Sequence, residues 1–150
     1  MSNTDFDPTL LDLDLDDIEE LPGFEVPWPG RYLMRLTAAM KEINNKSGLE
    51  LSYEVVECLE KNDPSSPDTA AGTKFSQVFF LTGTPEAVKT AKSFLKQQLK
   101  GIAEAVGEGN LLVLIRDHLQ GVMVEATVNR RKDKDDPERF YPVVKNMMLA

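Results

Sequence analysis

Residues 121–148 decide the predicted fold, and they read GVMVEATVNRRKDKDDPERFYPVVKNMM. Apolar side chains recur there at every second position, the period of a strand that buries one face; they are Val122, Val124, Ala126 and Val128. A charged loop at 129–139 follows, and then an apolar run from Phe140 to Val144. The stretch therefore predicts a strand, a charged loop and a returning strand.

The loop of this hairpin is rich in cations, and aromatic residues follow it. The basic residues are Arg130, Arg131, Lys132, Lys134 and Arg139, and the aromatic residues are Phe140 and Tyr141. Cations beside aromatic rings are suited to bind phosphates and bases. Four acidic residues share the loop, and a mixed-charge loop is also typical of a solvated turn. The hairpin alone leaves both interpretations open.

The charge of the chain is distributed unevenly. The formal net charge is −8, yet nine acidic residues and no basic residue precede Val26. Removing these nine from the 25 acidic residues leaves 16, against 17 basic residues. The remainder of the chain is therefore nearly neutral, and its overall acidity does not argue against nucleic-acid binding.

The length of 150 residues is that of one ordinary domain, which buries about two-thirds of its unfolded surface. A single Cys58 and a single His118 exclude an internal disulfide framework and a histidine-based metal cage. We expect both residues to be structural, and we predict no metal and no cofactor. The longest aliphatic run, 111–115, is far shorter than the roughly 20 residues of a spanning helix, and no signal sequence is recognisable. A cytoplasmic protein without a membrane partner is expected.

Residues 1–21 alternate acidic and apolar side chains without enough apolar mass to fold alone, so we predict a disordered acidic tail. Such a tail either solubilises the protein or docks on a basic, apolar groove, on a partner or on the protein's own DNA surface. Residues 22–150 are then the folded domain. Its first residues are broken by Pro22, Pro27 and Pro29, and we expect Phe24 and Trp28 to anchor them across one end of the fold.

The next segments predict a hairpin. Residues 31–41 alternate between apolar side chains and a basic outer face that carries Arg31 and Arg35. A turn at 44–48 follows, where Gly48 is expected to supply the positive φ. Residues 49–55 alternate again and predict the second strand. A polar loop at 61–72 then leads to a third strand at 73–81.

A helix should begin after Thr84, with Pro85 at its first position, and end at Gly107. Its predicted buried stripe is Val88, Ala91, Leu95, Leu99, Ile102 and Val106. A second stripe consists of Lys89, Lys92, Lys96 and Lys100, which either forms a solvated face or contacts phosphates. A short apolar segment at 111–119 precedes the final hairpin.

A hairpin, a third strand, a helix and a second hairpin follow one another in an OB-fold. We therefore predict a mostly β, five-stranded OB-fold barrel of Greek-key topology, with the helix between strands three and four. In that barrel the first–second and fourth–fifth strand loops bind oligonucleotides, and here both loops are basic. This coincidence favours nucleic-acid binding over the solvated-turn interpretation. A β-rich α+β sandwich remains an alternative.

Several short motifs resemble bacteriophage single-stranded-DNA-binding proteins of the OB-fold type. These motifs are LDDIEELPGF at 15–24, PGRY at 29–32, KSGLEL at 46–51 and LQG at 119–121. The resemblance implies binding to single-stranded DNA without sequence preference, in DNA replication or recombination within a host cell. It also implies an acidic tail that recruits replication or recombination proteins. Well-known bacterial relatives carry that tail at the C-terminus, whereas the acidic residues here are N-terminal.

The predicted DNA-binding residues are of two kinds. The cations expected to meet phosphates are Arg31, Arg35, Lys46, Lys74, Arg130, Arg131, Lys132, Lys134 and Arg139, and the aromatic residues expected to stack on bases are Trp28, Tyr53 and Tyr141. Five other aromatic residues are expected in the core: Tyr32, Phe75, Phe79, Phe80 and Phe94. Tyr53 lies on the apolar face of its strand, so a core position is its alternative.

Two other function classes were weighed. The same domain could serve as a protein-interaction adaptor of a replication or recombination complex, through the acidic tail or the lysine stripe. An enzyme is not expected, because no nucleophile elbow, phosphate loop or zinc spacing is present. The apolar residues Val143, Val144 and 147–149 either seal a homodimer or complete the core.

Overall fold

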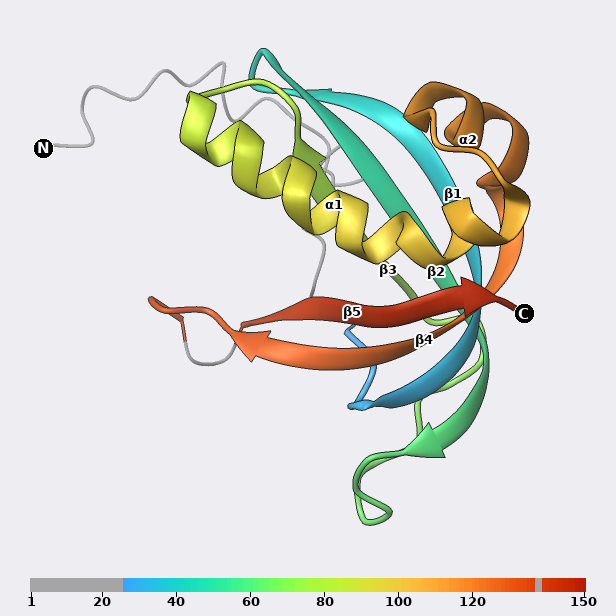
Figure 1. The fold of residues 1–150 in the computed structure, drawn as a ribbon. Coiled ribbons are helices and arrows are strands. Elements are labelled where there is room, and N and C mark those ends of the chain that lie inside the picture. The colour runs from blue at the N-terminus through green and yellow to red at the C-terminus, as the bar shows by residue number, and fades with distance from the viewer. Residues whose placement is uncertain (1–25, 137–138) are drawn as a thin grey trace, which may run out of the picture.

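A computed structural model describes residues 26–136 and 139–150, which form five strands and two helices (Figure 1). The elements are β1 (Gly30–Ile43), β2 (Lys46–Lys61), β3 (Lys74–Phe80), α1 (Pro85–Val106), α2 (Leu111–His118), β4 (Gln120–Lys132) and β5 (Phe140–Leu149). A mostly β fold with helical structure between the third and fourth strands is therefore confirmed. The predicted acidic tail and Phe24 lie outside the described residues.

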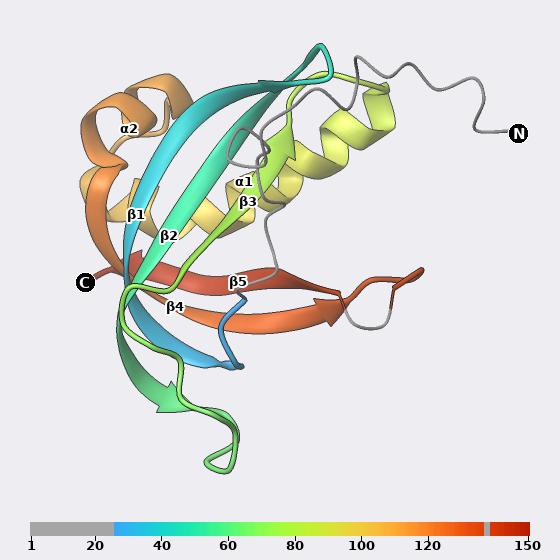
Figure 2. The same ribbon diagram turned by 180° about the vertical axis from the view of Figure 1, so that it is seen from behind.

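All five described strands belong to one antiparallel sheet in the order β3-β2-β1-β4-β5, which is not the arrangement of a two-sheet sandwich. The sheet is strongly curved into a half-barrel (Figures 1 and 2). Its inner face carries the buried side chains of alternate positions, as the strand period predicts; in β1 and β4 they are Tyr32, Met34, Leu36, Ala38, Val124, Ala126 and Val128. The opposite positions of these strands face outward.

The turn between β1 and β2 differs from the sequence prediction. Ile43 pairs with Lys46, so the loop has two residues, Asn44 and Asn45, and both adopt positive φ angles, 51° and 63°. Asparagine tolerates this conformation and is favoured in two-residue hairpin loops of this kind. Gly48 instead lies within β2, where an added Cβ would be 3.0 Å from a methyl group of Val78. Gly48 thus allows close packing between strands and does not form the turn.

The strands of the final hairpin extend farther toward its loop than the apolar alternation at 122–128 predicts. β4 continues to Lys132, and Arg131 and Lys132 pair with Tyr141 and Phe140 of β5. Arg130, Arg131 and Lys132, predicted in the loop, are therefore strand residues whose side chains are fixed to alternate faces. The apolar alternation that predicts β4 stops at Val128. The charged residues 130–132 that follow give no sign that the strand continues.

The helix signals are confirmed, and the structure adds a second helix. The Thr84 side chain accepts a hydrogen bond from the Ala87 N–H, and Gly107 ends α1 with a φ of 72°. Asn110 caps α2, which the sequence showed only as a short apolar segment. Phe94 was expected in the core, but 58% of its surface is exposed. Gln98, which the predicted stripe omitted, is buried.

Helix α1 packs across the opening between β3 and β5, where its Leu95, Leu99 and Ile102 side chains enter the core. Gln98 makes a polar contact in the same place. Its Nε2 donates to the Tyr53 hydroxyl and to Gln77 Oε1, the latter over 2.6 Å. Gln77 Nε2 in turn donates to the Pro142 carbonyl over 3.4 Å. One chain of hydrogen bonds therefore links β2, α1, β3 and β5.

The closeness of α1 to β5 gives a prediction at Gly101. An added Cβ there would lie 2.6 Å from the Met147 carbonyl oxygen, which belongs to the backbone. Helix propensity alone predicts that Gly101→Ala stabilises the protein by about 1 kcal/mol. We expect instead a lower free energy of unfolding, by about 1–3 kcal/mol, because the helix must move away from β5. Urea denaturation followed by circular dichroism measures the change.

The control for this prediction is Gly109→Ala. No atom lies within 4 Å of a Cβ added at Gly109, so the free energy of unfolding should hardly change. A Gly101→Ala variant as stable as the wild type would contradict the packing of α1 on β5.

Candidate nucleic-acid interface

The β1–β2 turn lies at the top of the molecule and the β4–β5 hairpin extends to one side, with the first turns of α1 between them (Figures 1 and 2). Lys46 begins β2 directly after the turn, and most of the other predicted cations lie at the end of the β4–β5 hairpin that is next to its loop. The β4–β5 hairpin borders the opening of the half-barrel, whereas Lys46 lies near Phe80 at the end of β3.

The β4–β5 hairpin presents an aromatic ring with two guanidinium groups close to it. The Tyr141 ring centroid lies 5.8 Å from the Arg131 guanidinium carbon and 5.2 Å from that of Arg139. Arg131 is the direct pairing partner of Tyr141 across the two strands, which explains why they meet. A half-exposed ring with cations beside it can stack on a base while those cations contact the adjoining phosphates.

Asp133 holds the ring in place. The Tyr141 hydroxyl donates to Asp133 Oδ2 over 2.5 Å, while Asp133 Oδ1 accepts from the N–H groups of Asp135 and Asp136. The hydrogen bond from Tyr141 is the main reason that the pKa of Asp133 lies below its ordinary value, and the same bond raises the pKa of Tyr141. Asp133 therefore braces the loop and is not simply a charge that repels phosphate.

A second cation–aromatic cluster lies at the start of the described chain. The Arg130 guanidinium carbon is 3.9 Å from the Trp28 ring centroid and 5.3 Å from that of Phe140. The guanidinium also donates to the carbonyls of Val26 and Pro27. Partial burial lowers the pKa of Arg130. Arg130 therefore anchors the segment before β1, as was expected of Trp28, and the Trp28 ring remains 37% exposed.

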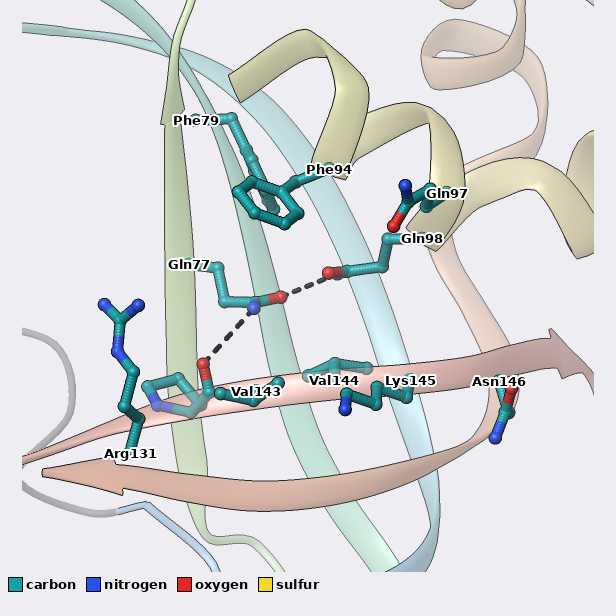
Figure 3. Close-up of a pocket in the computed structure, with 11 residues that line it drawn as sticks. Gln77, Phe79, Phe94, Gln97, Gln98, Arg131, Val143, Val144, Lys145 and Asn146 are labelled. Carbon is teal, nitrogen blue, oxygen red and sulfur yellow. Dashed lines mark hydrogen bonds between the residues drawn. The ribbon is translucent and has the colours of Figure 1, made fainter. Parts of the chain in front are cut away.

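A groove of about 480 Å³ runs between β3, α1 and β5 (Figure 3). Figure 3 shows Phe94 extending from α1 toward β3, and the Gln77 and Gln98 side chains meeting between α1 and β5. Arg131 lines the groove at its hairpin end, and Lys145 lines it farther along β5. Because Arg131 also contacts the Tyr141 ring, the groove and the Tyr141 cluster form one continuous surface.

The remaining predicted cations are arranged differently. Arg31 and Arg35 lie on the outer face of β1, where Arg31 donates to Glu125 and Thr127 and Arg35 donates to the Gly121 carbonyl. Lys46 lies 6.0 Å from the ring centroid of Phe80, which is 37% exposed. Lys74 lies 3.9 Å from Glu54, and Lys132 and Lys134 are exposed on the hairpin. The structure thus brings together the hairpin cations and leaves Lys74 apart from them.

Tyr53 does not belong to the interface. It is 1% exposed, its ring stacks on Phe75 with centroids 4.8 Å apart, and burial raises its pKa. A ring in this position cannot meet a base, so the prediction that Tyr53 stacks on DNA is wrong. Its place on the apolar face of its strand was the signal for the core alternative, which the structure confirms.

The sequence prediction also missed residues that now belong to the candidate surface. Phe80 and Phe94 were assigned to the core but are exposed, and Lys145 was not considered. Phe94 follows Ser93 and precedes Leu95, so it lies beside the predicted apolar stripe and outside it. Apolar periodicity leaves the rotation of a helix uncertain by one position, so no local signal separated an exposed Phe94 from a buried one.

The contact between Asp133 and Tyr141 leads to a prediction of pH dependence. A carboxylate with a lowered pKa keeps its hydrogen bond above its unfolded-state pKa, about 3.9, and loses it as the pH falls through the lower folded value. The raised pKa of Tyr141 keeps the hydroxyl protonated beyond about pH 10. We expect the Tyr141 ring signals in an NMR spectrum to stay constant from pH 5 to pH 9 and to shift only in stronger acid.

Asp133→Asn is the variant that tests this interpretation. It should shift the Tyr141 ring signals at neutral pH and remove their movement in acid, whereas Asp135→Asn should do neither. A midpoint of the Tyr141 shift near pH 6 would contradict the assignment of the titration to Asp133.

Within residues 26–136 and 139–150 there is no group of three or more His, Cys, Asp or Glu side chains that could hold a metal ion. In the same part of the chain, none of the helices is long and apolar enough to cross a membrane. The chain matches no model of a known protein family, and no curated protein sequence matches it either.

Proposed function

We propose that this protein binds single-stranded DNA without sequence preference, with the strand crossing the β4–β5 hairpin and entering the groove beside α1. Bases stack on Tyr141 and Phe94, and phosphates meet Arg131, Arg139 and Lys145. Stacking accepts any base because every base has an aromatic face, and phosphate contacts carry no sequence information. The proposal places the protein in phage replication or recombination, inside the host cell.

The observation that carries the proposal is the Tyr141 ring with Arg131 and Arg139 close to it. Asp133 fixes the hydroxyl of that ring, so the ring is oriented before any ligand arrives. A preoriented ring loses less freedom on binding than a mobile one, which favours affinity.

The strand order supports the proposal independently. In the order β3-β2-β1-β4, the fourth strand lies beside the first, which is compatible with the Greek-key order that the proposal requires. An OB-fold has this connectivity in a partly open five-stranded barrel, and it binds oligonucleotides through the β1–β2 and β4–β5 loops. Here the β4–β5 hairpin borders the groove, whose described lining includes Arg131 and Lys145 and no acidic residue.

A protein-interaction adaptor is the second candidate. It is favoured by an apolar groove of about 350 Å³ on the other side of α1, which leucine side chains line and three lysines border. Such a groove can receive a peptide without any nucleic acid. An adaptor of this kind would show no affinity for oligonucleotides, so the DNA-binding experiment separates the two candidates.

We expect Tyr141→Ala to weaken binding of a fluorescein-labelled poly-dT oligonucleotide by about 5- to 150-fold, equivalent to the roughly 1–3 kcal/mol lost with a stacked base. Fluorescence anisotropy of the full chain at low salt measures this loss. Tyr141→Phe keeps the ring and removes the hydrogen bond to Asp133, so it should weaken binding less. An absence of binding by the wild type at low salt would refute the proposal and favour the adaptor.

The salt dependence of the same titration tests the phosphate contacts. If four or five phosphates are neutralised, log affinity should fall against log salt with a slope of about −3, using roughly 0.7 per phosphate. Arg131→Gln should lower the magnitude of this slope. The matched control is Arg116→Gln, because Arg116 is exposed on α2 and forms an ion pair with Asp117. Equal slopes for the two variants would contradict a contact between Arg131 and phosphate.

A further inference from the structure

The groove between α1 and α2 differs in chemistry from the candidate DNA surface. Its apolar lining comes from Leu81, Leu95, Leu99, Leu111 and Leu114. Lys92, Lys96 and Lys100 stand along α1 at its border, together with one acidic residue, Glu104. A ligand that matches this surface needs apolar side chains for the floor and several negative charges for the rim.

Phosphates would satisfy the lysine rim and leave the leucine floor without a partner. An acidic peptide that also carries leucine satisfies both, because apolar burial and charge attraction then act together. The first segment of this chain has that composition. Residues 10–21 read LLDLDLDDIEEL, with six acidic residues, six apolar residues and no basic residue.

The arrangement of these side chains also matches the groove. In residues 11–16 leucine and aspartate alternate strictly, so an extended chain presents leucines on one side and carboxylates on the other. Leucines directed into the floor leave the carboxylates near the border where the three lysines lie. The row Lys92, Lys96, Lys100 follows the i, i+4 spacing of one helix face, which gives a continuous line of positive charge.

The chain is long enough for this contact. The 16-residue interval from Leu10 to Val26 can span up to about 55 Å when extended. This reach is about four times the radius of gyration, about 14 Å, that is expected for a folded unit of 125 residues such as 26–150. The leucines at 11, 13 and 15 lie 11–15 residues before Val26, so they can reach a face about 37–51 Å away, whereas Leu21 lies five residues before Val26 and stays within about 17 Å of it.

We propose that the α1–α2 groove binds residues 10–21 of its own chain, with leucines on the apolar floor and carboxylates beside Lys92, Lys96 and Lys100. This contact uses the flank of α1 that faces away from the Gln98 side and the candidate DNA groove. It does not depend on the proposed DNA binding, and its test contains no DNA.

Paramagnetic relaxation in the full chain tests the contact. A nitroxide label is attached at Thr9→Cys in a Cys58→Ser background, so that each molecule carries one label. We expect loss of the amide signals of Lys96, Lys100 and Leu111 in the labelled sample and their recovery after reduction of the nitroxide. Loss of the Arg131 and Tyr141 signals instead would overturn the proposal, as would no loss anywhere in the folded part.

Charge reversal supplies a matched control. Lys96→Glu combined with Lys100→Glu should abolish the signal loss at Leu111, whereas Lys89→Glu should leave it unchanged. Lys89 belongs to the same exposed lysine row but does not line the groove. An equal effect of the two variants would mean general charge attraction and would overturn the proposed site.

A mixed sample distinguishes one molecule from two. Isotope-labelled chains without nitroxide are combined with nitroxide-bearing chains that carry no isotope. We expect no loss of signal in this mixture, because the contact is within one chain. Loss at Leu111 in the mixture would show that a second copy occupies the groove, which would overturn the intramolecular contact.

Discussion

The separation of β3 from β5 is the constraint on which the rest of this structure depends. The sheet ends at these two strands, and an open edge with unpaired backbone groups is a liability in water. Helix α1 covers the opening, and Gly101 permits its close approach to the Met147 carbonyl. The helix fills part of the gap, and what remains is the groove that Phe94 and Arg131 line. The candidate interface is thus a consequence of how the half-barrel is closed.

The hydrogen bonds of Gln98 fix how α1 sits in that opening. A buried amide without partners costs about 1–3 kcal/mol, so rotations of α1 that remove Gln98 from Tyr53 and Gln77 are penalised. Leu95, Leu99 and Ile102 supply most of the apolar contact, but leucine-rich packing alone tolerates small rotations. The directional bonds select one rotation. That rotation also places Phe94 on the flank of α1 beside the groove between β3 and β5, and Lys96 on the flank beside α2.

The elements of this fold were predictable from the sequence because their signals are local. Alternation identified β1 and β4, and Thr84, Pro85 and Gly107 fixed both ends of α1. The contacts of the candidate site were not predictable in this way. Arg131 meets Tyr141 through strand pairing ten residues away, and nothing local shows whether Arg130 or Arg131 faces that ring. The exposure of Phe94 and the burial of Gln98 depend on how α1 is rotated about its axis. Apolar periodicity leaves that rotation uncertain by one position.

The two flanks of α1 border two cationic grooves that differ in the ligand they suit. On one flank, Phe94 lies beside a groove with Arg131 at its end, and guanidinium groups near aromatic rings suit phosphates that adjoin stacked bases. On the other flank, ammonium groups border aliphatic side chains, which suits carboxylates that alternate with leucine. An acidic segment is attracted to either cation cluster, since unlike charges attract whatever their chemistry. The leucines favour the groove between α1 and α2, because five leucine side chains line it, whereas amide side chains interrupt the apolar lining of the other groove. The contact proposed for the acidic segment therefore leaves the arginine surface open for the nucleic acid proposed to bind there.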